Sequence, residues 1–325
     1  MITSEIIGTG SYLPEKIVTN DDLSKIMDTN DQWIESRSGI KERRISQGED
    51  TSDLSVKAAM RAMEYAKLEA EDIDLIIVAT VTQDMYTPST ACIVQKKIQA
   101  YNATAFDINA ACSGFLYSIS VANAMIKAGQ HKVVLVIGAE VLSKAINWED
   151  RATAVLFGDG AGAVIMKASE DSGIKGVYTM SEGDKGENLE IGAKDVGNPF
   201  LDANLVETKY PYIAMNGREV FKFATRAMVT AIEKVLLETK EELCNIKCII
   251  PHQANYRIIQ YVSKKMDTPI ERFYINLDKY ANTSAATIPI ALDEAVRAGR
   301  IKKGDKIILV GFGGGLTYGS ALIKW

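Results

Sequence analysis

The feature that most constrains the fold of this chain is a weak internal repeat. Residues 111–129 read ACSGFLYSISVANAMIKAG, and residues 281–299, which lie 170 positions later, read ANTSAATIPIALDEAVRAG. Each copy has the pattern of a helix that ends at a glycine, and each is preceded and followed by an apolar run typical of a buried strand. Because strand, loop, helix and strand recur in this order, we predict a duplicated α/β architecture with a boundary near residue 170.

The length and charge of the chain fit such a protein. At about 150 residues per domain, 325 residues allow two units. The net charge of −5, from 37 basic and 42 acidic residues, argues against a nucleic-acid binder. No run approaches the ~18 apolar residues of a membrane span. The start, MITSEIIGTGSYLPEK, lacks the pattern of a signal peptide. We therefore expect a cytoplasmic protein whose four cysteines stay reduced.

Cys112 lies where an expected strand gives way to an expected helix, in the segment AFDINAACSGF. Small neighbours leave room for a ligand to approach its thiol. The partial positive charge and free N–H groups of a helix start favour the reactive thiolate. A small buried structural cysteine fits this segment as well. The other cysteines lack a neighbouring histidine or a second cysteine pair, so we expect no zinc site at Cys92, Cys244 or Cys248.

The chain has only two histidines. His252 follows the apolar run CIIP and precedes a helical pattern, which is where open α/β sheets place their chemistry. A histidine at this place can donate a hydrogen bond or act as an acid or base, and a polar loop residue is the alternative. His131 follows a helix-ending glycine in a polar turn, so we expect it to be exposed.

Asn282 occupies the position in the repeat that corresponds to Cys112. If the halves are pseudo-symmetric, the two helix starts meet at one site, where the Asn282 amide can donate to a developing oxyanion. Capping of the helix is the alternative role. The glycines of GFGGG, residues 311–315, permit close approach to a substrate, and their N–H groups can complete an oxyanion hole. Residues 181–212 lack periodicity and are predicted to form a long excursion, a candidate lid.

Together these segments resemble the β-ketoacyl-acyl-carrier-protein synthase III family, the condensing enzymes that start bacterial fatty-acid synthesis. The resemblance runs from IIGTGSYLPE through DINAACSGF, PHQANYRII and NTSAATIPIALDEAVRAGRIKKGD to GFGGGLTYGSALI. It implies a thiolase-like five-layered αβαβα fold made of two duplicated halves. Residues 1–170 would hold the nucleophilic cysteine and residues 171–325 the histidine and the asparagine. It also implies a homodimer.

The resemblance implies a catalytic triad of Cys112, His252 and Asn282, with an oxyanion hole formed by the backbone N–H groups of Cys112 and Gly314. In the implied reaction Cys112 takes the acyl group of an acyl-CoA and releases CoA. Malonyl-acyl-carrier protein then loses CO2, and its enolate, held by His252 and Asn282, attacks the acyl group to give a 3-oxoacyl product. Acyl-CoA is a substrate in this scheme, and neither a separate cofactor nor a metal is implied.

The resemblance also implies substrate contacts. The residues expected to contact CoA, with Trp33 and Arg151 on the two faces of adenine, are Thr29, Trp33, Arg37, Arg151, Gly217, Ala254 and Asn255. Relatives often carry Asn where this chain has Arg218, which puts nucleotide contacts there in doubt.

The expected walls of the acyl pocket are Thr87, Leu142, Phe157 and Leu189. Some relatives that prefer acetyl-CoA have a bulky Phe in place of Thr87, a position often supplied by the partner subunit, so we predict a roomier pocket. The basic residues expected to dock the acidic carrier protein are Lys222, Arg257, Lys264 and Lys265.

Several other classes of protein share some of these residues. Elongating ketosynthases need a second histidine at the site, and His131, in a polar turn, is not expected to supply it. Degradative thiolases need a second cysteine near the C-terminal glycines, where GFGGG has none. A relative that acts in secondary metabolism would keep the same triad. Papain-like hydrolases also use Cys, His and Asn in this order. A carrier-binding scaffold without catalysis is a further alternative, and it would not need the Cys112 thiol.

Overall fold

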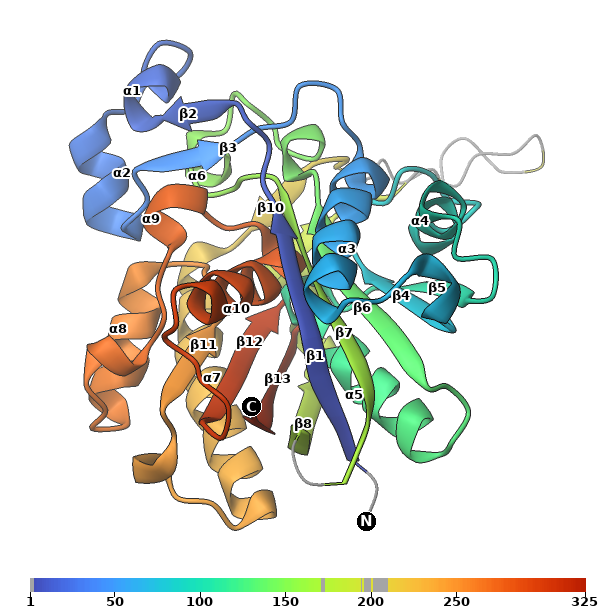
Figure 1. Cartoon of the computed structure of the whole chain (residues 1–325). Coiled ribbons are helices and arrows are strands. Elements are labelled where there is room, and N and C mark those ends of the chain that lie inside the picture. The colour runs from blue at the N-terminus through green and yellow to red at the C-terminus, as the bar shows by residue number, and fades with distance from the viewer. Residues whose placement is uncertain (1–2, 171–172, 194, 196–199, 201–209) are drawn as a thin grey trace.

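The chain folds around two β-sheets, one from each half of the sequence (Figure 1). The computed structural model describes residues 3–170, 173–193, 195, 200 and 210–325. The first sheet has the order β1-β7-β6-β4-β5 and comprises β1 (Thr3–Tyr12), β4 (Leu75–Ala79), β5 (Thr104–Ile108), β6 (Val133–Glu140) and β7 (Gly160–Ser169). The second has the order β11-β12-β13-β8 and comprises β8 (Gly173–Ser181), β11 (Cys248–Pro251), β12 (Lys306–Gly313) and β13 (Thr317–Lys324).

Helices form the remaining three layers. Between the sheets lie α5 (Gly114–Lys127) and α10 (Thr287–Arg297), which share one buried apolar cluster with strands of both sheets. The outer face of the first sheet is covered by α3 (Thr51–Ala66) and α4 (Thr90–Ile98). The outer face of the second is covered by α7 (Gly217–Thr239) and α8 (Tyr256–Lys265). This is the five-layered αβαβα arrangement predicted from the sequence.

Shorter elements complete the chain. Two-stranded pairs are formed by β2 (Ile17–Thr19) with β3 (Glu42–Arg44) and by β9 (Leu189–Ile191) with β10 (Ile213–Met215). The short helices are α1 (Asn20–Leu23), α2 (Asp31–Ser38), α6 (Arg151–Ala154) and α9 (Leu277–Tyr280). The 3₁₀ turns that matter for the site are η2 (Ala111–Ser113), η3 (Leu142–Lys144), η4 (Gly183–Asn188) and η8 (Ser284–Ala286).

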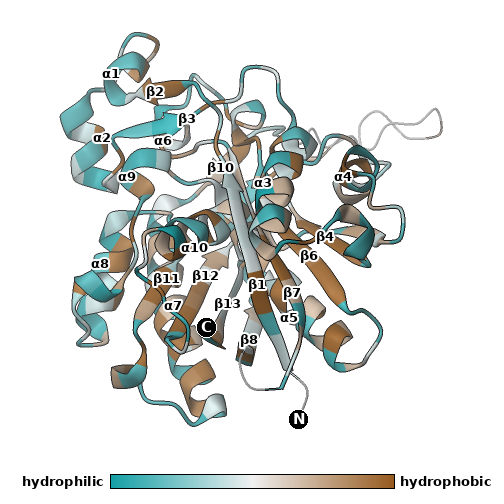
Figure 2. Ribbon diagram, viewed as in Figure 1, coloured by the Kyte–Doolittle hydropathy of each residue, from teal (hydrophilic) through white to brown (hydrophobic). Residues whose placement is uncertain are grey.

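The apolar runs of the sequence form strands because both faces of each sheet are covered. Leu75 and Ile77 of β4 face the inner helices, whereas Ile76 and Val78 face α3 and α4. Successive strand residues point to opposite faces, so a strand between two helical layers must be apolar at every position. Figure 2 shows this pattern, with hydrophobic residues gathered on the strands and hydrophilic residues on outer helices such as α2 and α8. No helix in the described part of the chain is long and apolar enough to cross a bilayer.

The strand pairings confirm the duplication. In the first sheet β4 is parallel to β6, and β6, β7 and β1 follow one another in antiparallel order. In the second sheet β11 is parallel to β12, and β12, β13 and β8 repeat that order. A parallel bridge between Ile249 and Phe273 takes the place of the pairing of β4 with β5. The junction of the two halves falls between β7 and β8, and division into domains at residue 170 stays a proposal.

The register of the repeat differs from the prediction at one end. The left-handed glycines that follow the two inner helices, Gly129 and Gly299, are 170 positions apart, as expected. The helices start differently, because α5 has 14 residues and α10 has 11. The left-handed residue before α5 is Ala111 (φ +46°), and the left-handed residue before α10 is Ser284 (φ +48°). The prediction that Asn282 is the structural equivalent of Cys112 is therefore wrong, because the offset at the helix starts is three residues larger.

Candidate active site

A cavity of about 870 Å³ is lined by residues from both halves of the chain. Cys112 lies in η2, just before α5, and His252 directly follows β11. Asn282 precedes η8, and Gly314 follows β12. Three of them follow strands, namely β5, β11 and β12, whereas Asn282 follows α9, and all four line the same cavity. The structure thus brings together the residues predicted to form the triad and the oxyanion hole.

The backbone around Cys112 is held tightly. Ala111 has a left-handed backbone, which turns the chain sharply into η2. Gly313 packs against Cys112 so closely that a Cβ on Gly313 would lie 2.6 Å from the Cys112 nitrogen. The Thr317 hydroxyl donates to the carbonyl oxygen of Ala110 at 3.0 Å. The glycine-rich segment therefore lies directly on the backbone of the candidate nucleophile.

The Cys112 thiol is protonated in this state of the site. Burial raises its pKa to about 12, which outweighs the lowering effect of the Ser284 hydroxyl, and the nearby Glu140 carboxylate raises it further. The sequence argument expected the helix start to favour thiolate. The structure corrects this, because Cys112 as a residue is only 7% exposed and the loss of hydration of its thiol outweighs the effect of the helix start.

His252 is buried, and its environment keeps the ring neutral. Burial lowers its pKa to about 3. The backbone N–H donates to Val310 at 2.8 Å, and the ring packs edge-on against Phe312 at 5.2 Å between centroids. Nδ1 lies 2.6 Å from the hydroxyl of Thr287 in α10. Nε2 is buried and has no hydrogen-bond partner among the residues that the structure describes.

The Asn282 side chain is oriented by a backbone donor. Its Oδ1 accepts from the N–H of Ser284 at 2.8 Å, and its own N–H donates to the carbonyl of Leu156 at 3.0 Å. Because a backbone N–H can only donate, Oδ1 must face Ser284 and the Nδ2 group must point elsewhere. Asn282 therefore fixes the start of η8 through Oδ1, but Thr283 occupies the N-cap position, so Asn282 is not the capping residue. Its NH2 group is left over.

Glu140, at the end of β6, is a buried acid that the sequence analysis missed. Its carboxylate accepts from the Thr80 hydroxyl and from the N–H groups of Val81 and Thr82, each at 3.1 Å, and also from the Thr82 hydroxyl. Burial raises its pKa to about 7, although these bonds and Ser284 lower it. Glu140 thus fixes the segment after β4, whose residue Val81 lines the cavity.

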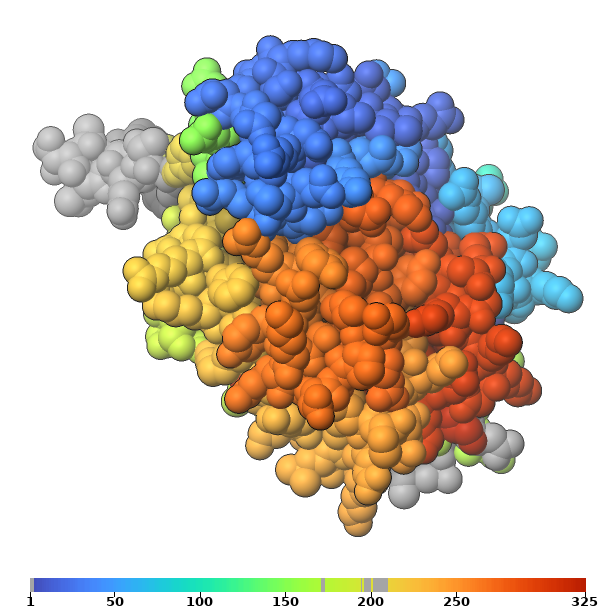
Figure 3. Space-filling view, turned by 90° about the vertical axis from the view of Figure 1, so that its left-hand side faces the viewer, coloured from blue at the N-terminus to red at the C-terminus, as the bar shows by residue number. Residues whose placement is uncertain are grey.

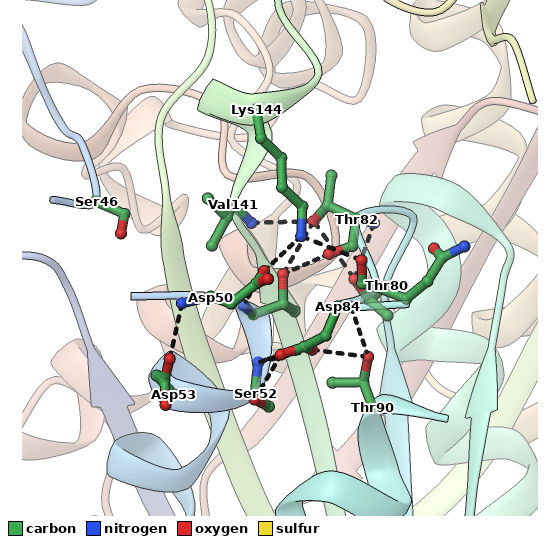
Figure 4. A network of polar contacts seen from close by, with 12 residues as sticks. Ser46, Asp50, Ser52, Asp53, Thr80, Thr82, Asp84, Thr90, Val141 and Lys144 are labelled. Carbon is green, nitrogen blue, oxygen red and sulfur yellow. Dashed lines mark hydrogen bonds and ion pairs between the residues drawn. The ribbon is translucent and has the colours of Figure 1, made fainter. Parts of the chain in front are cut away.

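A second polar network fixes the rest of that segment (Figure 4). Asp84 accepts from the backbone N–H and hydroxyl of Ser52, at the start of α3, and from Thr90. Lys144 donates to the Gln83 carbonyl at 3.1 Å and pairs with Asp50. The loop is therefore anchored up to residue 84, and beyond it Tyr86 is 75% exposed while still lining the cavity.

Most of the residues predicted to contact CoA lie at the cavity. Those that line it are Trp33, Arg37, Gly217, Ala254 and Asn255. Thr29 and Arg151 do not line it, but the Arg151 guanidinium stacks on the Trp33 ring at 5.3 Å and also bonds to Asp28. This spacing leaves no room for a third planar group. Adenine can therefore lie between Trp33 and Arg151 only if Arg151 moves.

The predicted acyl-pocket residues divide in the same way. Leu142, Phe157 and Leu189 line the cavity, whereas Thr87 is exposed and does not. In the excursion at residues 181–212, η4 and β9 form one wall of the cavity. The predicted lid includes residues 194, 196–199 and 201–209, which lie outside the described residues.

The predicted docking residues are all exposed. Arg257, Lys264 and Lys265 lie on α8, and Lys222 lies on α7, where it pairs with Glu219 at 2.6 Å. Arg257 also donates to the carbonyl of Ser36 at 2.7 Å. Figure 3 shows this face, with the orange residues of α8 against the blue segment that holds α1 and α2.

Three further site residues escaped the sequence analysis: Thr287, Ser284 and Glu140. Two of them, Glu140 and Thr287, offered a weak signal, namely a polar residue inside or at the end of a strongly apolar pattern. Glu140 ends the run VVLVIGAE, and Thr287 starts a helix whose other first-turn residues are apolar. Their partners come from distant parts of the chain, so the pattern alone does not reveal what they do.

Comparisons with known proteins agree with this site. Two family models match, 3-oxoacyl-[acyl-carrier-protein] synthase III over residues 106–183 and its C-terminal part over residues 237–325. A β-ketoacyl-[acyl-carrier-protein] synthase III of Clostridium acetobutylicum is 55% identical over 100% of this chain and 99% of its own length. The crystal structure of 3-oxoacyl-[acyl-carrier-protein] synthase III from Aquifex aeolicus is 47% identical, with a TM-score of 0.92 over 99% of this chain and 100% of that one. The priming β-ketosynthase of the R1128 polyketide pathway is 32% identical, with a TM-score of 0.89 over 98% of this chain and 96% of that one. The chain therefore belongs to the β-ketoacyl-acyl-carrier-protein synthase III family.

Proposed function

We propose that this chain joins an acyl-CoA primer to malonyl-acyl-carrier protein by decarboxylative condensation, through an acyl group carried on Cys112. As a member of its family the chain is an acyl-transferring condensing enzyme of fatty-acid biosynthesis. The observation that carries the proposal is the shared cavity, which Cys112, His252, Asn282 and Gly314 line together.

The first half-reaction transfers the acyl group. The Cys112 sulfur attacks the thioester carbonyl, the carbon–sulfur bond to CoA breaks, and the thiol proton ends on the departing CoA sulfur. The backbone N–H groups of Cys112 and Gly314 stabilise the oxyanion of the tetrahedral intermediate. The close packing of Gly313 on Cys112 supports this arrangement because it holds the two segments together. Each such donor lowers the barrier by about 3 kcal/mol.

The second half-reaction uses neutral donors. When malonyl-acyl-carrier protein loses CO2, the electron pair of the broken carbon–carbon bond forms a thioester enolate, so no base is required. His252 Nε2 and Asn282 Nδ2 hold the enolate oxygen. A neutral histidine suits this role, and burial keeps the His252 ring neutral. The enolate carbon then attacks the acyl group on Cys112, and the carbon–sulfur bond to Cys112 breaks. The departing thiolate takes up a proton from solvent, which restores the thiol.

The substrates approach from the faces already described. CoA lies along Trp33, Arg37, Gly217, Ala254 and Asn255, after Arg151 swings away from Trp33. The carrier protein docks on α8, through the basic residues listed above for that face. The reaction in this form uses acyl-CoA as substrate and no separate cofactor.

We further propose a homodimer in which Thr87 of each subunit reaches the acyl pocket of the other. The exposure of Thr87 and of its neighbours Met85 (50%) and Tyr86 (75%) supports this, because exposed apolar side chains that follow the anchored part of a loop favour a covered position. With Thr in place of a bulky residue, the pocket accepts branched and longer primers. A profile restricted to acetyl-CoA would contradict this part of the proposal.

Mass spectrometry after incubation with acetyl-, isobutyryl- and longer acyl-CoAs tests the function. We expect a mass gain on Cys112, none in Cys112→Ser, and a 3-oxoacyl product when malonyl-acyl-carrier protein is added. Release of free acid instead would indicate a hydrolase, and the absence of any mass gain would refute the proposal.

The similarity to the polyketide-priming structure favours one second candidate, the same chemistry in secondary metabolism. Faster reaction with a polyketide carrier protein than with the fatty-acid one would support that candidate.

A further inference from the structure

The ring of His252 holds a single proton, and its position decides what the ring can do. Because the ring is neutral, one nitrogen carries the proton and the other has a lone pair. Nδ1 faces the Thr287 hydroxyl at 2.6 Å, and Nε2 is left without a partner among the described residues. If the proton is on Nε2, His252 can donate to a substrate oxygen. If it is on Nδ1, Nε2 can only accept.

The hydroxyl of Thr287 has one proton and two acceptors within reach, His252 Nδ1 at 2.6 Å and the carbonyl oxygen of Ser284 at 3.0 Å. The backbone N–H of Thr287 already donates to that same carbonyl of Ser284. The carbonyl is therefore satisfied without the hydroxyl. Thr287 is buried at 2% exposure, so no solvent competes for its proton.

Two arrangements fit the 2.6 Å contact between Thr287 Oγ1 and His252 Nδ1, because either atom can be the donor. In one, Nδ1 donates and the hydroxyl proton goes to the Ser284 carbonyl, which already has a backbone donor. In the other, the hydroxyl donates to Nδ1, which has no other partner among the described residues, and Nε2 keeps a proton that it can donate into the cavity. We propose that Thr287 is a positioning residue that donates its hydroxyl proton to Nδ1 and so keeps the ring proton of His252 on Nε2.

This inference rests on the proposed function and deepens it. With the proton on Nε2, the neutral ring donates to the enolate oxygen formed on decarboxylation, beside the Nδ2 group of Asn282. Thr287 touches no substrate and acts through His252 alone. Loss of its hydroxyl should therefore affect the decarboxylation of malonyl-acyl-carrier protein and leave the acylation of Cys112 nearly unchanged.

Nitrogen-15 NMR of the histidine rings tests the tautomer directly, because the chain has only two histidines. The variant His131→Gln removes one set of signals and assigns the other to His252. We expect a directly bonded proton on Nε2 and none on Nδ1 in the wild type. A proton on Nδ1 would overturn the proposal, and this result needs no variant at Thr287.

Three variants test the role of the hydroxyl. Thr287→Val should give a mixture of the two tautomers and a decarboxylation rate lower by about 10²-fold, with acyl-Cys112 still formed near the wild-type rate. Thr287→Ser keeps the hydroxyl and should restore both the tautomer and the rate. Thr239→Val is the control, since Thr239 is another helical threonine whose hydroxyl donates to a backbone carbonyl, that of Val235.

The outcomes separate this inference from the proposed function. If Thr287→Val keeps the Nε2 proton and the wild-type rate of decarboxylation, the inference is wrong while the function stands. If the wild type has the Nε2 proton but no acyl-CoA acylates Cys112, the function is wrong. Should Thr287→Val fail to fold, the wild-type spectrum and the comparison with Thr287→Ser still decide.

Discussion

At the scale of single residues, burial dominates the chemistry of the site. It raises the pKa of Cys112 and Glu140 and lowers that of His252, so each of the three groups is shifted toward its uncharged form. A charged group loses its hydration in such a cavity, and the few hydrogen bonds present do not compensate. The site therefore holds neutral donors and acceptors, which suits an enolate that needs donors and no base.

The raised pKa of Glu140 predicts a pH-dependent cost in stability. Its ordinary pKa of 4.5 rises to about 7 in the fold, so between these values the folded protein holds a proton that the unfolded chain has lost. The free energy of unfolding therefore falls as pH rises from 4.5 to about 7. From pH 5 to pH 8 this loss is about 2–3 kcal/mol. The side chain in Glu140→Gln cannot ionise. The free energy of unfolding of this variant, relative to that of the wild type, should therefore rise by the same amount between pH 5 and pH 8.

Urea unfolding at pH 5 and pH 8 measures this difference. The contribution of His252 is common to both proteins and cancels. Glu64→Gln, at an exposed position on α3, is the control and should show no such change. An identical pH dependence in Glu140→Gln and the wild type would mean that Glu140 does not titrate in this window.

At the scale of elements, the close approach of β12 to η2 sets the position of the nucleophile. A Cβ on Gly313 would lie 2.6 Å from the nitrogen and 3.1 Å from the Cα of Cys112, and these backbone atoms cannot turn aside. We expect Gly313→Ala to shift Cys112 away from the Gly314 N–H group and slow its acylation by about 10²-fold.

The rate of acyl-Cys112 formation, measured by mass spectrometry in a rapid-quench series, checks this prediction. Gly183→Ala is the matched control, because a Cβ on Gly183 meets no atom within 4 Å. It should acylate at the wild-type rate. Wild-type acylation in Gly313→Ala would show that the two segments can separate without cost.

The elements also show how far the sequence alone could predict the structure. The inner helices and the strands beside them were predictable, because a strand covered on both faces must be apolar throughout. The three-residue difference between the starts of α5 and α10 was not predictable, because glycines mark only the ends of these helices. The roles of Glu140 and Thr287 also escaped, since each depends on a partner brought from a distant part of the chain. Cys112, His252 and Asn282 could be proposed because their local context and the family resemblance agree.

At the scale of the whole molecule, the negative charge of the chain conflicts with an acidic partner. The net charge of −5 repels an acidic carrier protein over long range, so docking needs a local positive surface. The exposed basic residues of α8 supply one, and the hydrogen bond of Arg257 to Ser36 ties this surface to α2. Lys264 and Lys265 do not line the cavity, so their charge can be changed without touching the chemistry.

We therefore expect the double variant Lys264→Glu, Lys265→Glu to raise the KM for malonyl-acyl-carrier protein by about tenfold at low salt, with less effect at high salt. Acylation of Cys112 by acyl-CoA should stay unchanged. The pair Lys302→Glu, Lys303→Glu changes the net charge equally at exposed positions in the turn before β12, so it is the matched control. Steady-state kinetics across a salt series distinguish the two cases. If both double variants raise the KM alike, the overall charge governs the encounter. If only the α8 pair does, the carrier protein docks on α8, and the entrance to the Cys112 cavity has a defined orientation relative to its partner.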